Sequence, residues 1–311
     1  LGLHDRITIG DMDPATGEIL AMVGSKDWFS QSYPEGCVPG QTCLFDPKVN
    51  VATYRIGRQP GSAFKPFAYV TAFGKGYNDM TTVVDEETNF GIWGEKEYIP
   101  HNYDEKFRGT VTLRQALAQS LNIPSIKVLL NLAGLQESIA TAHDMGITTL
   151  KDPSQYGPSI VLGGGEVKLL DIASAYGVFA MGGKRTPPLS IMRIVSGGGT
   201  TIQENTNTPI AVLSKEATDM VTSILSDNEA RTPIFGANSL LYFPDKLVAV
   251  KTGTTQDFRD GWVVGYSPNV LVAGVWVGNN DNSPMNKEPG IVVAGPIWRQ
   301  FMDYALSVIT P

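Results

Sequence analysis

The segment Arg58-Gln-Pro-Gly-Ser-Ala-Phe-Lys-Pro-Phe67 places a serine and a lysine three residues apart, after a glycine and before a proline. If a helix begins at Gly61 or Ser62, residues i and i+3 share a face, so the hydroxyl and the amine become neighbours. Pro66 is tolerated only in the first turn of a helix, where its missing N–H is not needed. The pattern therefore predicts a helix from about Ser62 to Gly74, with the serine at its positive end.

A serine hydroxyl beside a lysine amine is the arrangement of nucleophilic catalysis without histidine. Ser62 is the only serine of the chain that has a lysine three positions on. The plainer alternative is that Ser62 only caps the helix and that Lys65 is a solvated side chain. No G-x-S-x-G pattern occurs, which argues against an α/β-hydrolase.

The composition is that of a globular protein, with 311 residues, 42% hydrophobic and 18% charged. The net charge of −7 argues against nucleic acid or an anionic membrane surface as the main partner. No apolar run reaches the roughly 18 residues that a membrane span needs. Because strand-like sequence starts as early as Arg6, we expect the chain to be part of a longer protein.

Alternating patterns predict strands at both ends of the chain. Residues 6–12 and 18–23 form a hairpin, and residues 247–254, 261–266 and 270–277 form three strands joined by short turns. Short connections favour antiparallel pairing. We therefore expect one five-stranded antiparallel sheet built from the first and last parts of the chain.

Helical patterns fill the middle of the chain. A capping box at Thr112–Gln115 opens a helix that ends near Gln119, and Pro124 suits the first position of the next, which ends near Gly134. Further helices are expected at residues 136–145, 167–181 and 215–227, and a last one from Pro296 to about Val308.

The expected fold class is α/β (α+β): a five-stranded antiparallel sheet flanked by helices, with an inserted all-helical lobe. We expect one domain, residues 1–311, with a sheet lobe at about 1–60 and 230–311 and a helical lobe at about 61–229.

Two further polar motifs can complete the Ser62–Lys65 pair. Acyl-transfer enzymes with S-x-x-K carry an S-x-N and a K-T-G after it, and Lys251-Thr-Gly253 is the only K-T-G here. S-x-N occurs three times. Ser226–Asn228 follows a predicted helix, where it acts as a cap or exit, and Ser267–Asn269 is a hairpin turn. Ser120–Asn122, in a corner between two helices, is therefore the candidate.

With these motifs and their flanks, the chain resembles the transpeptidase domain of a class A, high-molecular-weight penicillin-binding protein. The resemblance covers nearly the whole chain and is carried by residues 13–24, 58–67, 109–124, 251–255 and 260–268. That family also has an upstream glycosyltransferase domain and a membrane anchor. The resemblance therefore implies a place on the extracytoplasmic face of the bacterial membrane, with membrane contact only through an N-terminal segment that this chain lacks.

The resemblance implies a role for each motif residue. Ser62 would be the nucleophile, and Lys65 the general base, neutral because of burial and a nearby cation, Lys251. Ser120 would pass a proton between the lysines and the leaving amine, and Asn122 would hold Lys65 and the substrate amide.

The implied substrate is a peptidoglycan stem peptide that ends in two D-alanines, and β-lactam antibiotics would acylate the same serine. Thr252, Gly253 and Thr254 would bind the terminal carboxylate and its neighbours. The backbone N–H groups of Ser62 and Thr254 would form the oxyanion hole. The resemblance implies no metal and no organic cofactor.

Several alternatives remain open at this stage. Lys251 can instead protect an edge strand from aggregation. A serine β-lactamase or D,D-carboxypeptidase, which release the acyl group to water, or a penicillin-sensing domain without turnover, would carry the same motifs. Cys37 and Cys43 form either a short-range disulfide, if the protein is exported, or two free thiols.

Overall fold

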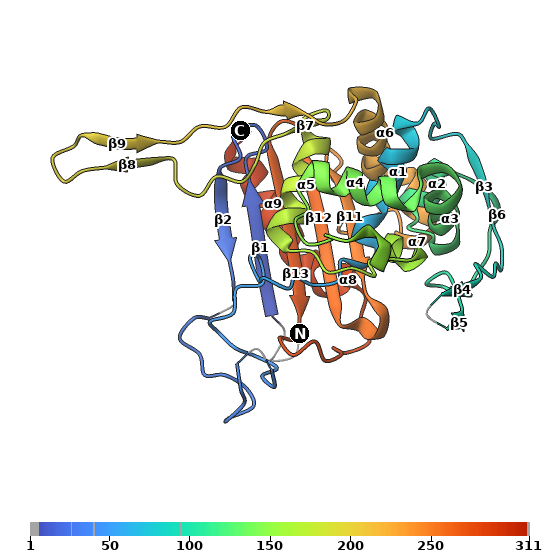
Figure 1. Ribbon diagram of the computed structural model, residues 1–311, viewed down its shortest axis with the longest axis horizontal. Coiled ribbons are helices and arrows are strands. Elements are labelled where there is room, and N and C mark those ends of the chain that lie inside the picture. Colours follow the sequence, from blue (N-terminus) through green and yellow to red (C-terminus); the bar gives the residue numbers. More distant parts are fainter. Residues whose placement is uncertain (1–5, 26, 40, 94, 310–311) are drawn as a thin grey trace.

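The computed structural model describes residues 6–309, except residues 26, 40 and 94. Its centre is a five-stranded antiparallel sheet in the order β11-β12-β13-β1-β2 (Figure 1). The strands are β1 (Arg6–Met12), β2 (Ile19–Val23), β11 (Ala249–Thr254), β12 (Asp260–Ser267) and β13 (Leu271–Gly278). The expected sheet of first and last segments is confirmed, and residues 1–5 of the predicted sheet lobe lie outside the described residues.

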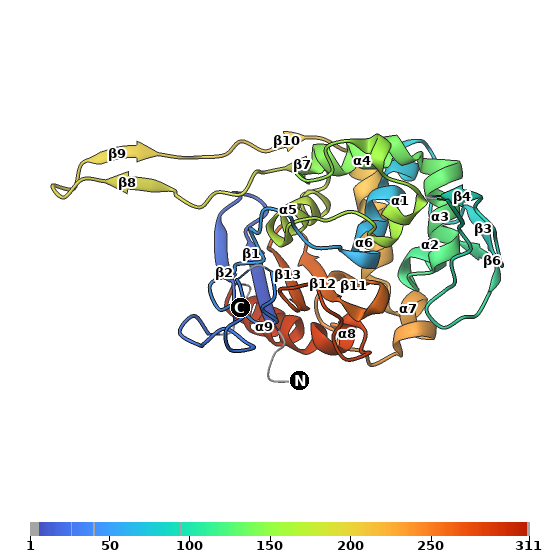
Figure 2. The same ribbon diagram turned by 60° about the horizontal axis from the view of Figure 1, so that its bottom comes forward.

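Helices cover both faces of this sheet, which makes three layers (Figure 2). On one face lie α8 (Gly290–Val293) and α9 (Gly295–Ile309), and Trp298 of α9 donates from Nε1 to the carbonyl oxygen of Ala273. On the other face lies α5 (Leu169–Ala180). Burial on both faces explains why β12 and β13 are apolar almost throughout rather than alternating.

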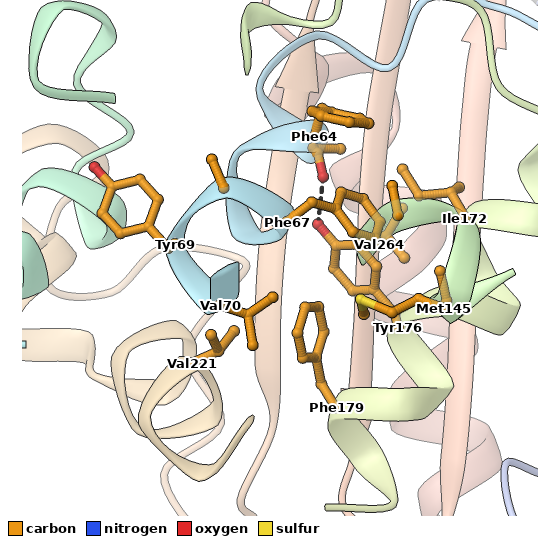
Figure 3. Packing of buried hydrophobic residues seen from close by; sticks show 14 of the residues in the cluster. Phe64, Phe67, Tyr69, Val70, Met145, Ile172, Tyr176, Phe179, Val221 and Val264 are labelled. Carbon is orange, nitrogen blue, oxygen red and sulfur yellow. Dashed lines mark hydrogen bonds between the residues drawn. The ribbon is translucent and has the colours of Figure 1, made fainter. Parts of the chain in front are cut away.

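The larger core lies between α5, the sheet and the serine-bearing helix (Figure 3). The segment begins as a 3-10 turn, η1 (Gly61–Phe64), and continues as α1 (Lys65–Gly74), with a proline in its first turn as expected. Phe67 of α1 packs its ring edge-to-face on Tyr176 of α5, with centroids 6.2 Å apart. The Tyr176 hydroxyl donates to the carbonyl oxygen of Ala63 at 2.7 Å. A buried aromatic contact thus fixes the backbone next to Ser62.

Most of the remaining helices pack around α1. The remaining helices are α2 (Leu113–Ala118), α3 (Asn122–Lys127), the π-helical η2 (Val128–Ala133), α4 (Leu135–Met145), the short 3-10 turns η3 (Pro153–Gln155) and η4 (Pro158–Leu162), α6 (Lys215–Ser226), α7 (Asn228–Phe235) and a further 3-10 turn, η5 (Gln256–Phe258).

One prediction about these helices needs correction, and one helix was not predicted. The helix expected to begin at Pro124 begins at Asn122, because an acceptor from another part of the chain caps its first N–H. The sequence also gave no indication of α7, which has Pro233 in its interior and Asp227 as its N-cap. The predicted capping box at Thr112 is confirmed.

Among the described residues, four short two-stranded sheets lie outside the five-stranded sheet. They pair β3 (Thr82–Asp85) with β6 (Gly109–Thr112), β4 (Ile92–Trp93) with β5 (Lys96–Glu97), β7 (Lys184–Arg185) with β10 (Ile210–Ala211), and β8 (Arg193–Val195) with β9 (Thr201–Glu204). The β8–β9 hairpin projects far from the rest of the molecule in both views (Figures 1 and 2).

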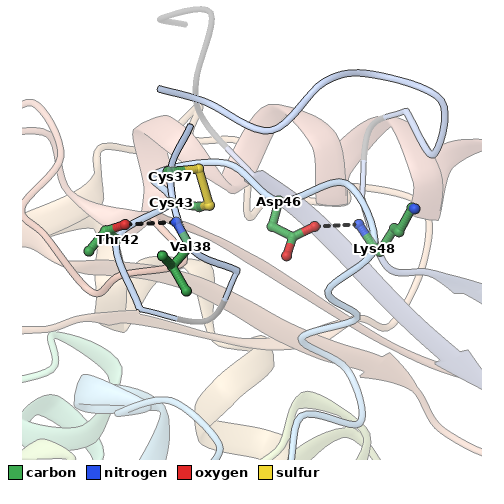
Figure 4. Close-up of a disulfide and its surroundings, with 6 residues drawn as sticks. All are labelled: Cys37, Val38, Thr42, Cys43, Asp46 and Lys48. Atoms are coloured by element: carbon green, nitrogen blue, oxygen red, sulfur yellow. Dashed lines mark hydrogen bonds between the residues drawn. A yellow bond between two sulfur atoms is a disulfide. The ribbon is translucent and has the colours of Figure 1, made fainter. Parts of the chain in front are cut away.

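Cys37 and Cys43 form a disulfide in the long loop between β2 and η1 (Figure 4). The bridge closes a turn in which Val38 N–H donates to the Thr42 hydroxyl at 2.9 Å. In the part of the chain that the structure describes, no helix has the length and apolarity to cross a membrane. Within the same residues, no three His, Cys, Asp or Glu side chains come together as a metal site.

Asp11 is a buried carboxylate in the middle of the sheet. Gly10 faces Leu169 of α5, so Asp11 points to the other face, opposite Ala273 on β13. It is 3% exposed, and its Oδ1 has no hydrogen-bond partner among the described residues. Burial raises the pKa of Asp11 from 3.8 to about 7, against the smaller effect of the Met12 backbone N–H.

Asp11 therefore makes the fold less stable as the pH rises. The folded state holds the proton up to about pH 7, whereas the unfolded chain releases it near pH 3.8. About three pKa units correspond to a loss of up to ~4 kcal/mol between pH 4 and pH 8. We expect urea unfolding of Asp11→Asn to lose this pH dependence and to show a gain in stability at pH 8. An equal decline of both proteins with pH would contradict the prediction.

Candidate active site

Two glycines allow the serine-bearing turn to lie directly against β11. Gly61 adopts a φ of +55°, and a Cβ there would lie 2.5 Å from the carbonyl oxygen of Thr254. A Cβ on Gly253 would lie 2.2 Å from the carbonyl oxygen of Pro60. Neither distance is possible for a real side chain. The S-x-x-K and K-T-G motifs, 186 residues apart between Lys65 and Lys251, are thereby brought into backbone contact.

Lys65 is fully buried and lies beside the corner between α2 and α3. Its Nζ donates to the backbone carbonyl of Ser120 at 2.6 Å and to Asn122 Oδ1 at 2.7 Å. It also lies 3.3 Å from Ser120 Oγ. Ser120 adopts a φ of +59°, which is uncommon for a residue other than glycine and turns both its carbonyl and its hydroxyl toward the amine.

Lys251 reaches the same hydroxyl from the other side. Its Nζ donates to Ser120 Oγ at 2.8 Å and to the carbonyl oxygen of Thr252 at 3.0 Å, and the residue is 3% exposed. Ser120 Oγ therefore stands between two buried amines. The structure brings together four predicted residues, Lys65, Ser120, Asn122 and Lys251, by direct hydrogen bonds.

Burial makes both amines poor carriers of positive charge. It lowers the pKa of Lys65 well below 10.5, and the positive charge of Lys251 lowers it further. Burial also lowers the pKa of Lys251 to about 7, with Arg231 as the second cause. Arg231 is itself 3% exposed and donates to the carbonyl oxygen of Leu225 at 2.6 Å. The site thus favours a neutral Lys65 at neutral pH.

Ser62, Ser120, Asn122, Thr252 and Thr254 line one cleft of about 630 Å³. Ser62 is half-buried at the start of η1, on the wall of this cleft. Within the described residues, the hydrogen bonds of Lys65 Nζ go to Ser120 and Asn122, and not to the hydroxyl of Ser62. The Thr254 hydroxyl accepts from the N–H of Gly290 at 2.9 Å, which leaves its own O–H free to donate. Gly253 lies between these threonines against the backbone of η1.

The other S-x-N triplets lie elsewhere. Ser226 ends α6, where its hydroxyl donates to the carbonyl of Thr222, and Asp227 caps α7. The triplet at Ser267 forms the turn between β12 and β13, in which Asn269 has a φ of +59°. Both match the structural roles that the sequence indicated.

Sequence reasoning did not identify the residues that surround the motif side chains. Asn102 accepts from the backbone N–H of Asn122, Asp85 accepts from Asn102, and Arg231 lies near Lys251. No motif marks them, since each acts through a contact between distant parts of the chain. Arg231 lies on α7, and because this helix was not predicted, the sequence offered no reason to place Arg231 near Lys251.

Comparison with known proteins identifies the family. Residues 7–303 match the family model "Penicillin binding protein transpeptidase domain". The chain belongs to the penicillin-binding protein transpeptidase family. The motifs suggested a resemblance to class A penicillin-binding proteins, and both the family model and the relatives described next confirm it.

Two relatives of this penicillin-binding family are similar over nearly the whole chain. Penicillin-binding protein 1A of Aquifex aeolicus (strain VF5) is 36% identical over 94% of this chain and 37% of its own length. Penicillin-binding protein 2D of Bacillus subtilis (strain 168) is 34% identical over 98% of this chain and 42% of its own length. The chain thus spans about two fifths of the length of these relatives.

Solved structures show the same fold. Penicillin-binding protein 1A from Haemophilus influenzae superposes with a TM-score of 0.83 at 24% identity, over 99% of this chain and 48% of that one. The PonA1 protein from Mycobacterium tuberculosis, in complex with penicillin V, superposes with a TM-score of 0.79 at 26% identity, over 98% of this chain and 79% of that one. The expected fold class is confirmed.

The contact between η1 and β11 predicts that Gly253 is needed for stability. In Gly253→Ala the new methyl group would meet the Pro60 carbonyl and Trp262, so one segment must move. We expect a loss of about 1–3 kcal/mol in the free energy of unfolding, typical of overpacking.

The matched control for this substitution is Gly197→Ala, in the β8–β9 turn, where a Cβ meets nothing within 4 Å. Urea titrations of both variants measure the difference. Equal stability of the two variants would show that η1 and β11 are not in close contact.

Proposed function

We propose that this chain is a serine D,D-transpeptidase domain that cross-links peptidoglycan stem peptides through an acyl-serine intermediate. The observation that carries the proposal is the hydroxyl of Ser120 held between two buried amines, beside a cleft lined by Ser62. Such a group can move protons at neutral pH without a histidine. The family of the chain supports the assignment.

The hydrogen bonds of Lys65 favour its action as a general base. A neutral amine has two N–H bonds and one lone pair, and the carbonyls of Ser120 and Asn122 accept both N–H bonds. The lone pair is left to take the proton of Ser62. Ser62 Oγ then bonds to the carbonyl carbon of the penultimate D-alanine, and its N–H and that of Thr254 hold the oxyanion.

Ser120 would carry the proton to the leaving group. Its Oγ accepts from Lys251, so its own hydrogen can point into the cleft. The bond between the carbonyl carbon and the nitrogen of the last D-alanine breaks, and that nitrogen receives the proton. An amine of a second stem peptide then attacks the carbonyl carbon of the acyl-serine and forms the cross-link. The bond between that carbon and Ser62 Oγ breaks, and Oγ takes up the proton that the amine releases.

The edge of β11 and its threonines would bind the substrate. β11 is an edge strand of the sheet, so a stem peptide can pair with its outer backbone groups. Thr252, Gly253 and Thr254 would hold the terminal carboxylate in the field of Lys251. A β-lactam resembles the two terminal D-alanines, and PonA1, a relative of similar fold, has been solved with penicillin V.

We also propose that residues 1–311 form one domain, with the sheet lobe at about 1–60 and 230–311 and the helical lobe at about 61–229. A peptidoglycan substrate implies that the domain works on the extracytoplasmic face of the bacterial membrane.

Benzylpenicillin should add its full mass to the protein through Ser62. We expect intact-mass spectrometry to show one stable adduct on the wild type and none on Ser62→Ala, because the proposed nucleophile would be removed. An adduct that persists in Ser62→Ala would contradict the assignment of the nucleophile. Rapid loss of the wild-type adduct would instead indicate a β-lactamase or carboxypeptidase.

The pH dependence of acylation should report the charge on Lys251. Lys65 acts only when neutral, so the rate rises as the pH passes its pKa, and the Lys251 cation keeps that pKa low. Lys251→Gln should raise the pKa of Lys65 and shift the acid limb of the profile to higher pH, besides slowing the reaction. The measurement is the second-order acylation rate from pH 5 to pH 9.

Two controls accompany this profile. Lys215→Gln changes an exposed lysine on α6 that pairs with Asp219, and its profile should match the wild type. Lys65→Ala should remain folded and acylate several orders of magnitude more slowly. An unmoved acid limb in Lys251→Gln would show that Lys251 does not tune Lys65.

A further inference from the structure

One loop, residues 98–108, holds Asn122 at both its backbone and its side chain. The backbone N–H of Asn122, at the first position of α3, donates to Asn102 Oδ1 at 2.8 Å. Its side-chain Nδ2 donates to the carbonyl oxygen of His101 at 2.7 Å. Leu121, in the N-cap position, has no side-chain oxygen with which to cap this helix. Asn102 supplies the missing cap from 20 residues upstream.

The contact with His101 decides which end of the Asn122 amide faces Lys65. A carbonyl oxygen can only accept, so Nδ2 must point to His101 and Oδ1 must point the other way. On that side Oδ1 accepts from Lys65 Nζ at 2.7 Å. The loop therefore sets one of the two carbonyl acceptors that occupy the N–H bonds of Lys65.

A buried carboxylate orients Asn102 in turn. Asp85, at the end of β3, has no exposed surface, and its two oxygens accept from Asn102 Nδ2 at 2.8 and 2.9 Å. One of these oxygens also accepts from the N–H of Arg108 at 3.0 Å and lies 3.9 Å from its guanidinium. Asn102 Nδ2 also donates to the carbonyl of Lys106 at 2.8 Å. With its nitrogen fixed in this way, Asn102 can present only its oxygen to Asn122.

A buried carboxylate is costly to desolvate, and its cost is met only when its hydrogen bonds are complete. A capped helix start on the surface does not need one. Asp85 is buried at this cost, and its hydrogen bonds orient Asn102, which in turn contacts Asn122. This arrangement indicates that the position of Asn122 matters, and not only the stability of the helix. Asn102 also lines the cleft, so this connection runs from the cleft wall to the base.

We propose that Asn102, oriented by Asp85, is a positioning residue for acyl transfer, which it supports by fixing Asn122 against Lys65. The inference rests on the proposed function. Asn102 is given no step of proton transfer. It determines where the amide of Asn122 stands, and thereby where the lone pair of Lys65 points.

The first test is the acylation of Asn102→Ala by a fluorescent penicillin, followed from pH 5 to pH 9. A shift of Asn122 by about 1 Å should slow acylation on the order of 10²-fold. Lys65 would also lose an acceptor that stabilises its ammonium form, so the acid limb should move to lower pH. The charged groups that face this part of the site are Lys251 on β11, with Arg231 of α7 near it, and Asp85, Arg108 and Asp104 on the side of Asn102. The substitution changes none of them.

A matched control separates positioning from stability. Asn78→Ala removes an asparagine of the same lobe whose Oδ1 accepts from the N–H groups of Met80 and Thr81. Its melting temperature should fall, while its acylation rate and acid limb should equal those of the wild type.

A charge swap keeps the test decisive if Asn102→Ala does not fold. Asn102→Asp alone places two carboxylates side by side and should acylate most slowly. Asn102→Asp combined with Asp85→Asn restores a single carboxylate and an acceptor for the N–H of Asn122. We expect the double variant to recover acylation by about tenfold over Asn102→Asp, the coupling expected for groups in contact.

The outcomes distinguish this inference from the function on which it rests. No acylation of the wild type at Ser62 would overturn both. Acylation of the wild type, together with an unchanged rate and acid limb in Asn102→Ala, would overturn the positioning role and leave the transpeptidase assignment standing. A folded double variant without recovery would also overturn it.

Discussion

Two buried amines share one hydroxyl, and the rest of the site depends on that constraint. Burial disfavours the charged form of both amines, and the charge of Lys251 further disfavours a charge on Lys65, so the pair favours the loss of one proton. Lys65 is fully buried, and this burial together with the charge of Lys251 lowers the pKa of Lys65 well below its ordinary value. Electrostatic repulsion and desolvation thus prepare a base at neutral pH that a solvated lysine would not provide.

The fold holds the two amines and the hydroxyl in position. Lys65 begins α1, Ser120 lies between α2 and α3, and Lys251 lies on a strand of the sheet. The aromatic core on Tyr176 fixes the serine-bearing turn, and glycines at 61 and 253 let this turn contact the strand. Since acyl transfer depends on placement within fractions of an ångström, a large rigid core is a direct contribution to the chemistry.

Sequence reasoning could predict what local pattern or motif encodes. The sheet, the capping box at Thr112 and the motif residues followed from alternation, helix signals and the family resemblance. Pairing across the chain was not readable in the same way. The true start of α3 depends on Asn102, α7 carries a proline that local rules exclude from a helix interior, and Cys37 and Cys43 allowed two answers. The start of α3 was missed because a tertiary contact decides it, whereas α7 and the disulfide lie in local segments whose pattern allowed more than one structure.

The central claim, a neutral Lys65 at neutral pH, can be measured directly. Protein labelled with ¹³C at the lysine ε-carbon would be titrated by NMR, and Lys65→Ala would assign the resonance. We predict that the Lys65 resonance titrates far below the ordinary lysine value of about 10.5. If the Lys65 resonance titrated near that ordinary value, Lys65 would be a cation at neutral pH and the account would be wrong.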